Sequence, residues 1–299
     1  MPLPIKITFL GTSGSTPTKE RSLPGVSIEY DGSVYLFDCG EGVQRQLMLY
    51  SINPSRIRCI FITHMHGDHV IGVAGLIRTL ALNKRTEPLH IYVPEGEQEK
   101  LRPLVDFDRA YIPYRIVIVG VKSGRVASGR GFTVSAFRLR HSVPTYGYVF
   151  KEDGRHRFNK ARCIKLGIKG SMFSDLERKG AIMVGKKKVR LEDVSDYAEG
   201  RKVAYITDTR PVSGAATAAS GADIMIHEAT YADSLKALAK ERMHSTAFES
   251  AGVANKAKAK KLVIFHMSAR YKKPDDLLKD ARRAFRNTSV AYDGMVIII

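Results

Sequence analysis

The chain has 299 residues, 44% hydrophobic and 26% charged, so it can bury one large core or two ordinary ones. No apolar run approaches the length of a membrane span and the N-terminus has no signal-peptide pattern, which argues against a membrane protein and predicts a cytoplasmic location. A formal net charge of +18 favours polyanionic partners, nucleic acid first. The three cysteines form no CxxC pair, which argues against a disulfide framework and a thiolate zinc site.

The first third of the chain alternates strand and helix patterns. Asp31-Gly32 separates two apolar runs and predicts a tight hairpin turn between them. The expected strands cover 5–10, 26–30, 34–37 and 58–62, and the expected helices cover 41–50 and 70–82.

A second series of strands and helices starts near Thr133. Its expected strands cover 133–139, 203–206, 224–226 and 262–265, and its expected helices cover 246–259 and 275–285. Strands outnumber helices and the two kinds of element come in a mixed order. We therefore expect an α/β fold whose mixed sheets are covered by helices.

The run from Thr63 to His69, THMHGDH, is the most informative part of the sequence. It places three histidines and one carboxylate directly after the expected strand 58–62, so a short loop can direct all four side chains at one point. Imidazole and carboxylate suit zinc and similar first-row metals, and two such ions can share a bridging water. The candidate ligands are His64, His66, Asp68 and His69. A histidine-rich surface loop is the alternative.

A site for two metal ions needs about seven or eight ligands, more than one short loop supplies. Three further metal-type side chains follow apolar, β-branched runs: His141 after 133–139, Asp208 after 203–206 and His266 after 262–265. A single histidine in such a place is more often a hydrogen-bonded core residue. Their shared context makes all three candidate ligands.

Glu228 and His244 suggest a second kind of chemistry. Glu228 ends the strand at 224–226, and His244 comes just before the helix at 246–259. A carboxylate that keeps a histidine protonated makes a general acid for a leaving alkoxide. The alternatives are a surface histidine in a capping loop and a glutamate paired with a local lysine.

Basic residues are concentrated in 151–190, which interrupts the second series. This segment has 13 Lys and Arg against 4 Asp and Glu, a net charge of +9 and half of the total of +18. Such a concentration favours binding to nucleic acid over a generally basic composition. A solvated basic hairpin without function is the alternative.

These motifs resemble the metallo-β-lactamase superfamily and, more narrowly, the short form of ribonuclease Z (tRNase Z), the endonuclease family that matures tRNA 3′ ends. Many hydrolases of the superfamily share the HxHxDH loop, whereas HEAT at 227–230, HST at 244–246 and the basic insert single out ribonuclease Z. Two features depart from the family pattern: 166–171 lacks the Gly-Pro pair of many family arms, and the loop 17–22 lacks a final asparagine. The resembling stretches are 37–44, 61–76, 141–148, 200–210, 227–230, 244–246 and 266–271.

The resemblance implies an αββα sandwich of two mixed sheets flanked by helices. It implies one domain over 1–299, with a protruding basic arm inserted at 151–195 that grips tRNA. It also implies two Zn²⁺ per subunit, with Mn²⁺ as an alternative. One ion is expected on His64, His66, His141 and Asp208, and the other on Asp68, His69, Asp208 and His266. Asp68 corresponds to the proposed general base, and His244 to a proton donor oriented by Glu228.

The implied substrate is precursor tRNA, cut 3′ to the discriminator to leave a 3′-hydroxyl on the tRNA and a 5′-phosphate on the trailer. The resemblance also implies a homodimer. The expected contacts with RNA are Lys19, Arg21, Arg155, Arg157, Lys160, Arg162, Lys165, Lys169 and Arg270.

Two other functions remain open at this point. Another dinuclear-zinc phosphodiesterase or esterase, acting on a small substrate, would have no affinity for tRNA and would tolerate deletion of 151–190. A non-catalytic RNA-binding protein on the same fold would be expected to have lost ligands, whereas every matching ligand position is filled.

Overall fold

The computed structural model describes residues 3–106 and 111–299. The chain divides into two compact units. Unit 1 is built from Met1–Ser128, Val134–Phe150 and Lys202–Ile299, and unit 2 from Gly129–Thr133 and Lys151–Arg201. Within the described ranges, no helix has the length and apolar character needed to cross a membrane.

The first sheet of unit 1 has seven strands and is mixed. In spatial order they are β20 (Val296–Ile298), β1 (Lys6–Gly11), β3 (Gly25–Tyr30), β4 (Ser33–Phe37), β5 (Ile57–Phe61), β6 (Leu89–Pro94) and β7 (Ile116–Val121). Neighbours from β20 to β4 are antiparallel, and those from β4 to β7 are parallel. The predicted hairpin joins β3 to β4, and Asp31 and Gly32 both have positive φ, as a two-residue turn of type I′ requires.

The second sheet also has seven strands. They are β19 (Thr288–Val290), β17 (Leu262–Phe265), β16 (Ile224–Glu228), β15 (Lys202–Ile206), β10 (Tyr146–Glu152), β9 (Phe132–Arg138) and β8 (Gly124–Gly129). The strands β15, β16, β17 and β19 run parallel to one another, so their C-terminal ends lie at one edge. That edge carries Asp208, Glu228 and His266.

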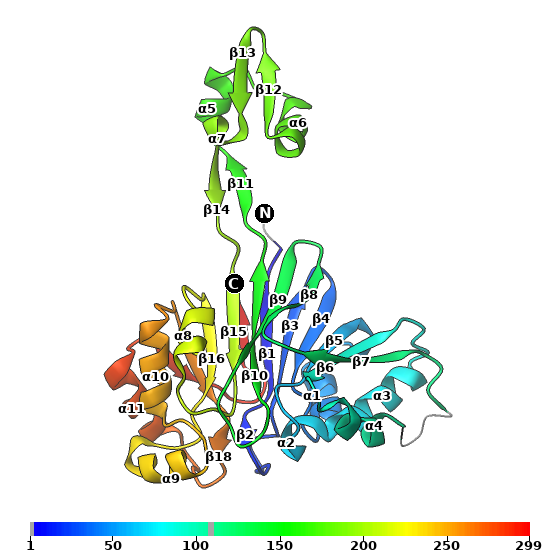
Figure 1. Cartoon of the computed structure of the whole chain (residues 1–299), viewed down its shortest axis with the longest axis vertical. Helices are drawn as coiled ribbons and strands as arrows, with labels where there is room; N and C mark the ends of the chain where they lie inside the picture. Colours follow the sequence, from blue (N-terminus) through cyan, green and yellow to red (C-terminus); the bar gives the residue numbers. More distant parts are fainter. Residues whose placement is uncertain (1–2, 107–110) are drawn as a thin grey trace. The chain divides into compact units, whose positions relative to one another are not determined.

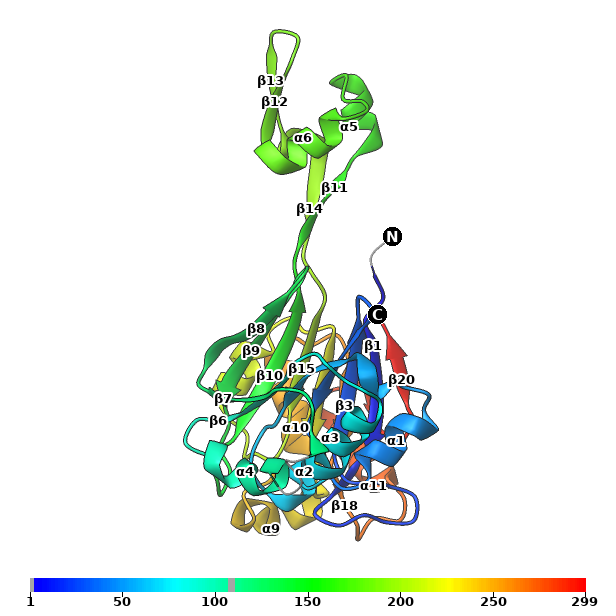
Figure 2. The same cartoon turned by 90° about the vertical axis from the view of Figure 1, so that its right-hand side faces the viewer.

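The two sheets lie face to face (Figures 1 and 2). Aromatic side chains from both sheets pack between them. The ring centroids of Phe37 on β4 and Tyr205 on β15 are 5.7 Å apart, and those of Phe61 on β5 and Tyr148 on β10 are 5.4 Å apart. The buried hydroxyl of Tyr148 donates to the Ile62 carbonyl oxygen at 2.8 Å. The interior therefore combines large apolar surfaces with satisfied polar groups.

Helices cover the outer faces of both sheets (Figure 1). On the first sheet they are α1 (Val43–Leu49), α3 (Gly72–Leu82) and α4 (Gln98–Asp106), and on the second α8 (Ser213–Ala218), α10 (Ala247–Lys256) and α11 (Asp275–Ala284). Val73, Leu76, Ile77 and Leu80 of α3 are buried, the spacing of one helical face. The shorter elements are β2 (Ser13–Gly14), η1 (Pro54–Arg56), α2 (Gly67–Val70), η3 (Asp233–Leu235), α9 (Lys236–Glu241) and β18 (Met267–Ser268).

The predicted α/β sandwich of mixed sheets flanked by helices is confirmed. The helix predicted over 70–82 is divided at Ile71 into α2 and α3. The stretch 83–132, for which no element was predicted, contains β6, α4, β7 and β8. The strand β6 lacks the clear alternation of apolar and polar residues that a half-buried strand shows, because it is buried along most of its length.

Unit 2 has a small apolar core of its own. The strand β11 (Arg155–Phe158) pairs antiparallel with β14 (Ser195–Ala198), and β12 (Ala181–Val184) with β13 (Lys187–Arg190). Its helices are α5 (Lys160–Lys165), α6 (Met172–Lys179) and α7 (Leu191–Val194). The core consists of Cys163, Ile168, Leu176, Val189, Leu191 and Val194. The predicted insert, 151–195, falls within this unit, and its role in binding RNA stays a prediction.

Candidate metal centre

The histidine-rich loop follows β5 and is held at its start by Asp38. The Asp38 carboxylate accepts hydrogen bonds from the backbone N–H of Thr63 at 2.8 Å and from its hydroxyl at 2.9 Å. Both residues are fully buried. Because these bonds fix the first residue of the loop, the side chains after it have little freedom to turn away from the sheet edge.

A first group of metal-type atoms comes from His64, His66, His141 and Asp208. Nδ1 of His66 lies 3.1 Å from Nε2 of His64 and 3.3 Å from Nε2 of His141. Oδ2 of Asp208 lies 3.6 Å from Nε2 of His64 and 3.8 Å from Nε2 of His141. Three ring nitrogens and one carboxylate oxygen therefore converge on a single point.

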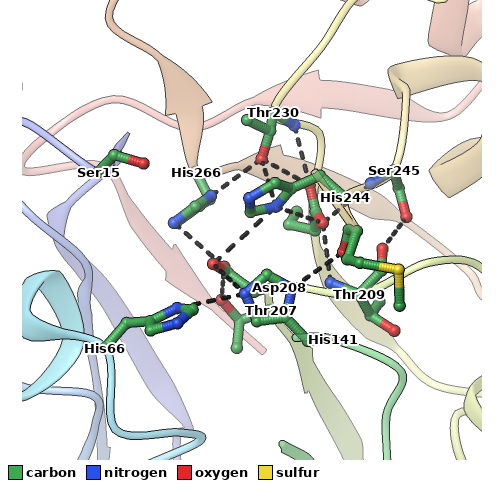
Figure 3. A network of polar contacts seen from close by, with 12 residues as sticks. Ser15, His66, His141, Thr207, Asp208, Thr209, Thr230, His244, Ser245 and His266 are labelled. Carbon is green, nitrogen blue, oxygen red and sulfur yellow. Dashed lines mark hydrogen bonds and ion pairs between the residues drawn. The ribbon is translucent and has the colours of Figure 1, made fainter. Parts of the chain in front are cut away.

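A second group comes from Asp68, His69 and His266. Nε2 of His69 and Nε2 of His266 are 3.3 Å apart, and Oδ2 of Asp68 lies 3.5 Å and 3.6 Å from them. The other oxygen of Asp208, Oδ1, lies 3.1 Å from Nε2 of His266 (Figure 3). The two oxygens of Asp208 thus face different groups, which suits a bridging carboxylate.

Outward hydrogen bonds set the direction of four of the five histidines. In each of the four, Nδ1 faces an oxygen of the surrounding protein, which leaves Nε2 directed at the centre. The four contacts are His64 to the Thr63 hydroxyl at 3.0 Å, His69 to Asp38 Oδ2 at 2.8 Å, His141 to the Met243 carbonyl at 3.0 Å and His266 to the Thr230 hydroxyl at 3.1 Å.

The donor set fits divalent metal ions of the first transition row. It consists only of imidazole nitrogens and carboxylate oxygens. Burial lowers the pKa of His69, but the carboxylates of Asp68, Asp38 and Asp208 outweigh burial and raise it to about 10. Burial raises the pKa of Asp68, but His69 and His266 more than reverse this and hold it below its usual value. The cluster therefore favours positive charge at its centre.

Glu228 and His244 form a buried pair beside the second group. Nδ1 of His244 lies 3.1 Å from Oε1 of Glu228. Burial lowers the pKa of His244, but the negative charges of Glu228 and Asp208 outweigh burial and raise it to about 9. Burial raises the pKa of Glu228, yet the charge of His244 lowers it to about 2. The glutamate is thus ionised and keeps the histidine protonated near neutral pH.

Backbone and side-chain donors hold Glu228 in place. Its Oε1 accepts the N–H groups of Thr209 at 2.9 Å and Ser245 at 3.0 Å, and its Oε2 accepts the N–H and hydroxyl of Thr230 at 3.0 Å and 2.7 Å. These bonds connect the loops that follow β15 and β16 with the loop before α10. The carboxylate therefore pairs with His244 and, through its hydrogen bonds, also holds three segments of the site together.

The metal-type residues open into a cavity of about 360 Å³, called the catalytic pocket below. The backbone N–H of Ser15 reaches into it and donates to Oδ2 of Asp68 at 2.8 Å. The Arg270 guanidinium lies over the Tyr231 ring, 5.0 Å from its centroid. The lining residues are Ser15, His66, Asp68, His141, Ser142, Asp208, Tyr231, Leu238, Arg242, His244 and Arg270.

The residues predicted to contact RNA fall into separate places. Arg270 lines the catalytic pocket, and Lys19 is exposed on the loop after β2. Arg21 instead donates to the Tyr271 carbonyl oxygen at 3.0 Å, a bond that ties this loop to the segment after β18. The other six residues, Arg155, Arg157, Lys160, Arg162, Lys165 and Lys169, belong to unit 2, where Arg162 pairs with Asp196.

Sequence reasoning gave no role to Asp38, Ser15 or Arg242. The only sign of Asp38 was its position at the end of β4, in the stretch 37–44. Ser15 acts through its backbone, which leaves no mark on the residue type. Arg242 lies two residues before the HST stretch, in a chain with many other arginines, and nothing in the pattern distinguished it.

Comparison with known proteins agrees with this geometry. The sequence profile of the metallo-beta-lactamase superfamily matches residues 26–157. Ribonuclease Z of Archaeoglobus fulgidus is 42% identical over 97% of this chain and 96% of its own length. Ribonuclease Z of Methanosarcina acetivorans is 39% identical over 99% of this chain and 98% of its own. The crystal structure of human tRNase Z, short form, superposes with a TM-score of 0.72 at 28% identity and covers 98% of each chain.

Proposed function

The chain belongs to the ribonuclease Z family, and on that premise we propose that it is a metal-dependent endoribonuclease that removes the 3′ trailer from precursor tRNA. The cut falls 3′ to the discriminator and leaves a 3′-hydroxyl on the tRNA. The observation that carries the proposal is the position of Asp208 between the two ligand groups: Oδ2 faces the first group and Oδ1 faces the second. Its Oδ2 also lies 3.9 Å from Nδ1 of His244, so the candidate proton donor is next to both groups. A nucleophile and a proton donor can therefore act on one phosphodiester.

The donor set supports two metal ions, for which we propose zinc, with manganese as the alternative. His64, His66, His141 and Asp208 would hold one ion, and Asp68, His69, His266 and Asp208 the other. When bound, the ions supply Lewis-acid stabilisation of the phosphate oxygens and lower the pKa of the attacking water.

Asp68 is placed to accept or steer the proton of that water. Its Oδ2 is held by the Ser15 N–H at 2.8 Å, and its lowered pKa keeps it ionised. The carboxylate lines the catalytic pocket together with His244. It can therefore act as a general base without moving out of the ligand group.

His244 is the proton donor for the leaving 3′ oxygen. Its Nδ1 is engaged by Glu228, which leaves Nε2 available to the substrate. The protonated form persists at neutral pH because the pKa of His244 is raised to about 9. Loss of such a donor costs on the order of a hundred-fold or more in rate.

Unit 2 supplies basic side chains that we propose bind the tRNA away from the cut. Backbone phosphates fix the register of an RNA without reading its bases, which suits an enzyme that accepts many tRNAs. A homodimer and a cytoplasmic location remain predictions from the family resemblance.

The proposal is tested by cleavage of a 3′-extended precursor tRNA with the purified, metal-loaded protein. We expect a single cut at the discriminator that His64→Ala abolishes. His90→Ala, a histidine of β6 outside both ligand groups, is the matched control and should cut normally. If the wild type hydrolyses bis(p-nitrophenyl) phosphate but leaves the tRNA intact, the enzyme is a small-substrate phosphodiesterase and the proposal is wrong.

A further inference from the structure

A second cavity lies next to the catalytic pocket in unit 1 and has no part in the chemistry described above. Its volume is about 500 Å³, within the range of roughly 300–1,000 Å³ that is usual for ligand pockets. Five cations and one carboxylate line it: Arg140, Arg210, Lys236, Lys240, Lys256 and Glu249. We call it the basic cavity.

The basic cavity and the catalytic pocket share their walls. Arg140 lines the basic cavity, and the next residue, His141, lines the catalytic pocket. Likewise, Met243 lines the basic cavity and His244 lines the catalytic pocket. In α9 and its flanks, Lys236 and Lys240 face the basic cavity whereas Leu238 faces the catalytic pocket. One segment, 236–244, therefore separates the two cavities and carries the proton donor at its end.

Arg210 is the one cation of the basic cavity with a clear structural role. Its guanidinium donates to both carboxylate oxygens of Glu249, at 2.5 Å and 2.8 Å, and also to the His244 carbonyl oxygen. Glu249 in turn caps α10 by accepting from the Thr246 N–H at 3.0 Å. The charges of Arg210 and Glu249 thus cancel, and the bond from Arg210 to the His244 carbonyl oxygen fixes the segment that carries His244.

The other four cations have no such partner. In the described part of the chain, no carboxylate lies within ion-pair distance of Arg140, Lys236, Lys240 or Lys256. Lys240 and Lys256 lie in the last turns of α9 and α10, where a cation complements the helix dipole. Lys236 is the first residue of α9, where a cation opposes the dipole, so local helix stability does not explain it.

We propose that the basic cavity binds the RNA strand on the tRNA side of the scissile phosphate, an inference that rests on the proposed function. Backbone phosphates contact Arg140 and the three lysines, and a sugar or base packs on the apolar surface of Met243, Phe248 and Val253. The side of the strand follows from the chemistry. The leaving 3′ oxygen belongs to the tRNA and receives its proton from His244, so the nucleotides attached to it lie on the His244 side of the pocket.

The test compares two triple variants of the full-length, metal-loaded enzyme. Lys236→Gln, Lys240→Gln and Lys256→Gln together remove three cations of the basic cavity. The matched control removes the same charge with Lys84→Gln, Lys258→Gln and Lys261→Gln. Lys258 and Lys261 precede β17, whose other end leads to His266. Lys84 follows α3, whose other end is near the HxHxDH loop. All three control lysines therefore lie at the far ends of these elements from the metal groups.

We expect KM for precursor tRNA to rise on the order of ten-fold or more in the cavity variant, with kcat little changed. At ~0.7 per phosphate for single strands, the loss of three contacts should also reduce the slope of log affinity against log salt by about 2. The control variant should match the wild type in both. Hydrolysis of bis(p-nitrophenyl) phosphate and the melting temperature report folding and metal loading independently of RNA binding.

The strand is identified with neutral methylphosphonate linkages in the substrate. Linkages placed just 5′ of the discriminator should weaken binding to the wild type but not add to the defect of the cavity variant. The same linkages in the trailer should affect both enzymes equally. Normal tRNA binding by the cavity variant overturns the proposal. So does the opposite pattern, in which linkages in the trailer weaken binding to the wild type but add nothing to the defect of the cavity variant. A wild type that does not cut tRNA at all would instead contradict the proposed function.

Discussion

Nδ1 of His244 lies 3.1 Å from Oε1 of Glu228, a carboxylate that is fully buried and holds four further hydrogen bonds. An ionised group in such surroundings is stable only with compensating donors and a positive partner. The relationship therefore explains how His244 keeps its proton near neutral pH, as its proposed role as donor to the leaving 3′ oxygen requires.

Glu228→Gln should move the alkaline limb of the pH–rate profile to lower pH. Burial alone lowers the pKa of His244, and the Glu228 charge is the largest influence that raises it, to about 9. Without that charge, His244 loses its proton as pH rises through neutrality, so kcat should fall far more at pH 8.5 than at pH 6. The measurement is kcat of both enzymes from pH 5.5 to 9.5. Because Glu228 also holds three loops together by hydrogen bonds, metal content and melting temperature are measured in parallel. An unchanged alkaline limb would show that His244 is not the acid.

Asp208→Ala should release metal from both ligand groups. Each oxygen of Asp208 faces a different group, at 3.6 Å from His64 and 3.1 Å from His266. His64→Ala removes a ligand from the first group only and should retain metal in the second. Bound metal per chain, measured by mass spectrometry after dialysis, distinguishes the two variants. We expect kcat to fall at least ~10²–10³-fold for Asp208→Ala. Equal metal retention by both variants would contradict a bridging role.

Asp38→Asn should weaken metal binding although Asp38 is not a ligand. Its Oδ2 accepts from Nδ1 of His69 at 2.8 Å and from the Tyr205 hydroxyl at 2.9 Å. Such partners orient a metal-binding histidine, and their loss typically costs about 10–100-fold in metal affinity. Competition with a chelator measures the change. Asp223→Asn is the control, because Asp223 pairs with Lys260 and touches no ligand. Equal affinities in the two variants would show that Asp38 serves the fold alone.

Lys165→Gln with Lys169→Gln should raise KM for precursor tRNA and leave hydrolysis of bis(p-nitrophenyl) phosphate unchanged. Both lysines are exposed in unit 2, and no carboxylate in the described residues neutralises them. At about 1 unit of salt slope per phosphate contact, the double variant should also bind tRNA with a shallower salt dependence. Arg178→Gln with Lys179→Gln is the matched control, since Asp175 already pairs with both at 2.7 Å and 3.1 Å. A larger defect in the control pair would mean that α6, and not α5 and its following loop, contacts the RNA.

The sequence predicted which residues the structure brings together in the two ligand groups, because each of them ends or follows an apolar run. Asp208 and His266 follow strands of the same parallel set, whose C-terminal ends meet at one edge, and their shared position after β-branched apolar runs made them candidate ligands before any contact was known. The partners of the ligands were not predictable in this way. Asp38 meets His69 across 31 residues because β4 and β5 pair within one sheet, and Tyr205 meets Asp38 across 167 residues because the two sheets pack face to face. The basic cavity went unnoticed for the same reason: Arg140, Lys236 and Lys256 have ordinary local patterns, and their common lining appears only in three dimensions.

The ends of the two products formed from a 3′-extended precursor tRNA in a single turnover decide whether this site works as described. A proton donated by His244 to the 3′ oxygen, with water as the nucleophile, predicts a 3′-hydroxyl on the tRNA and a 5′-phosphate on the trailer. Both ends should disappear in His244→Ala and in metal-depleted enzyme, and should return when Zn²⁺ is added back to the wild type. A 2′,3′-cyclic phosphate with a 5′-hydroxyl, or cleavage that survives complete metal removal, would contradict the two-metal mechanism and the role of His244.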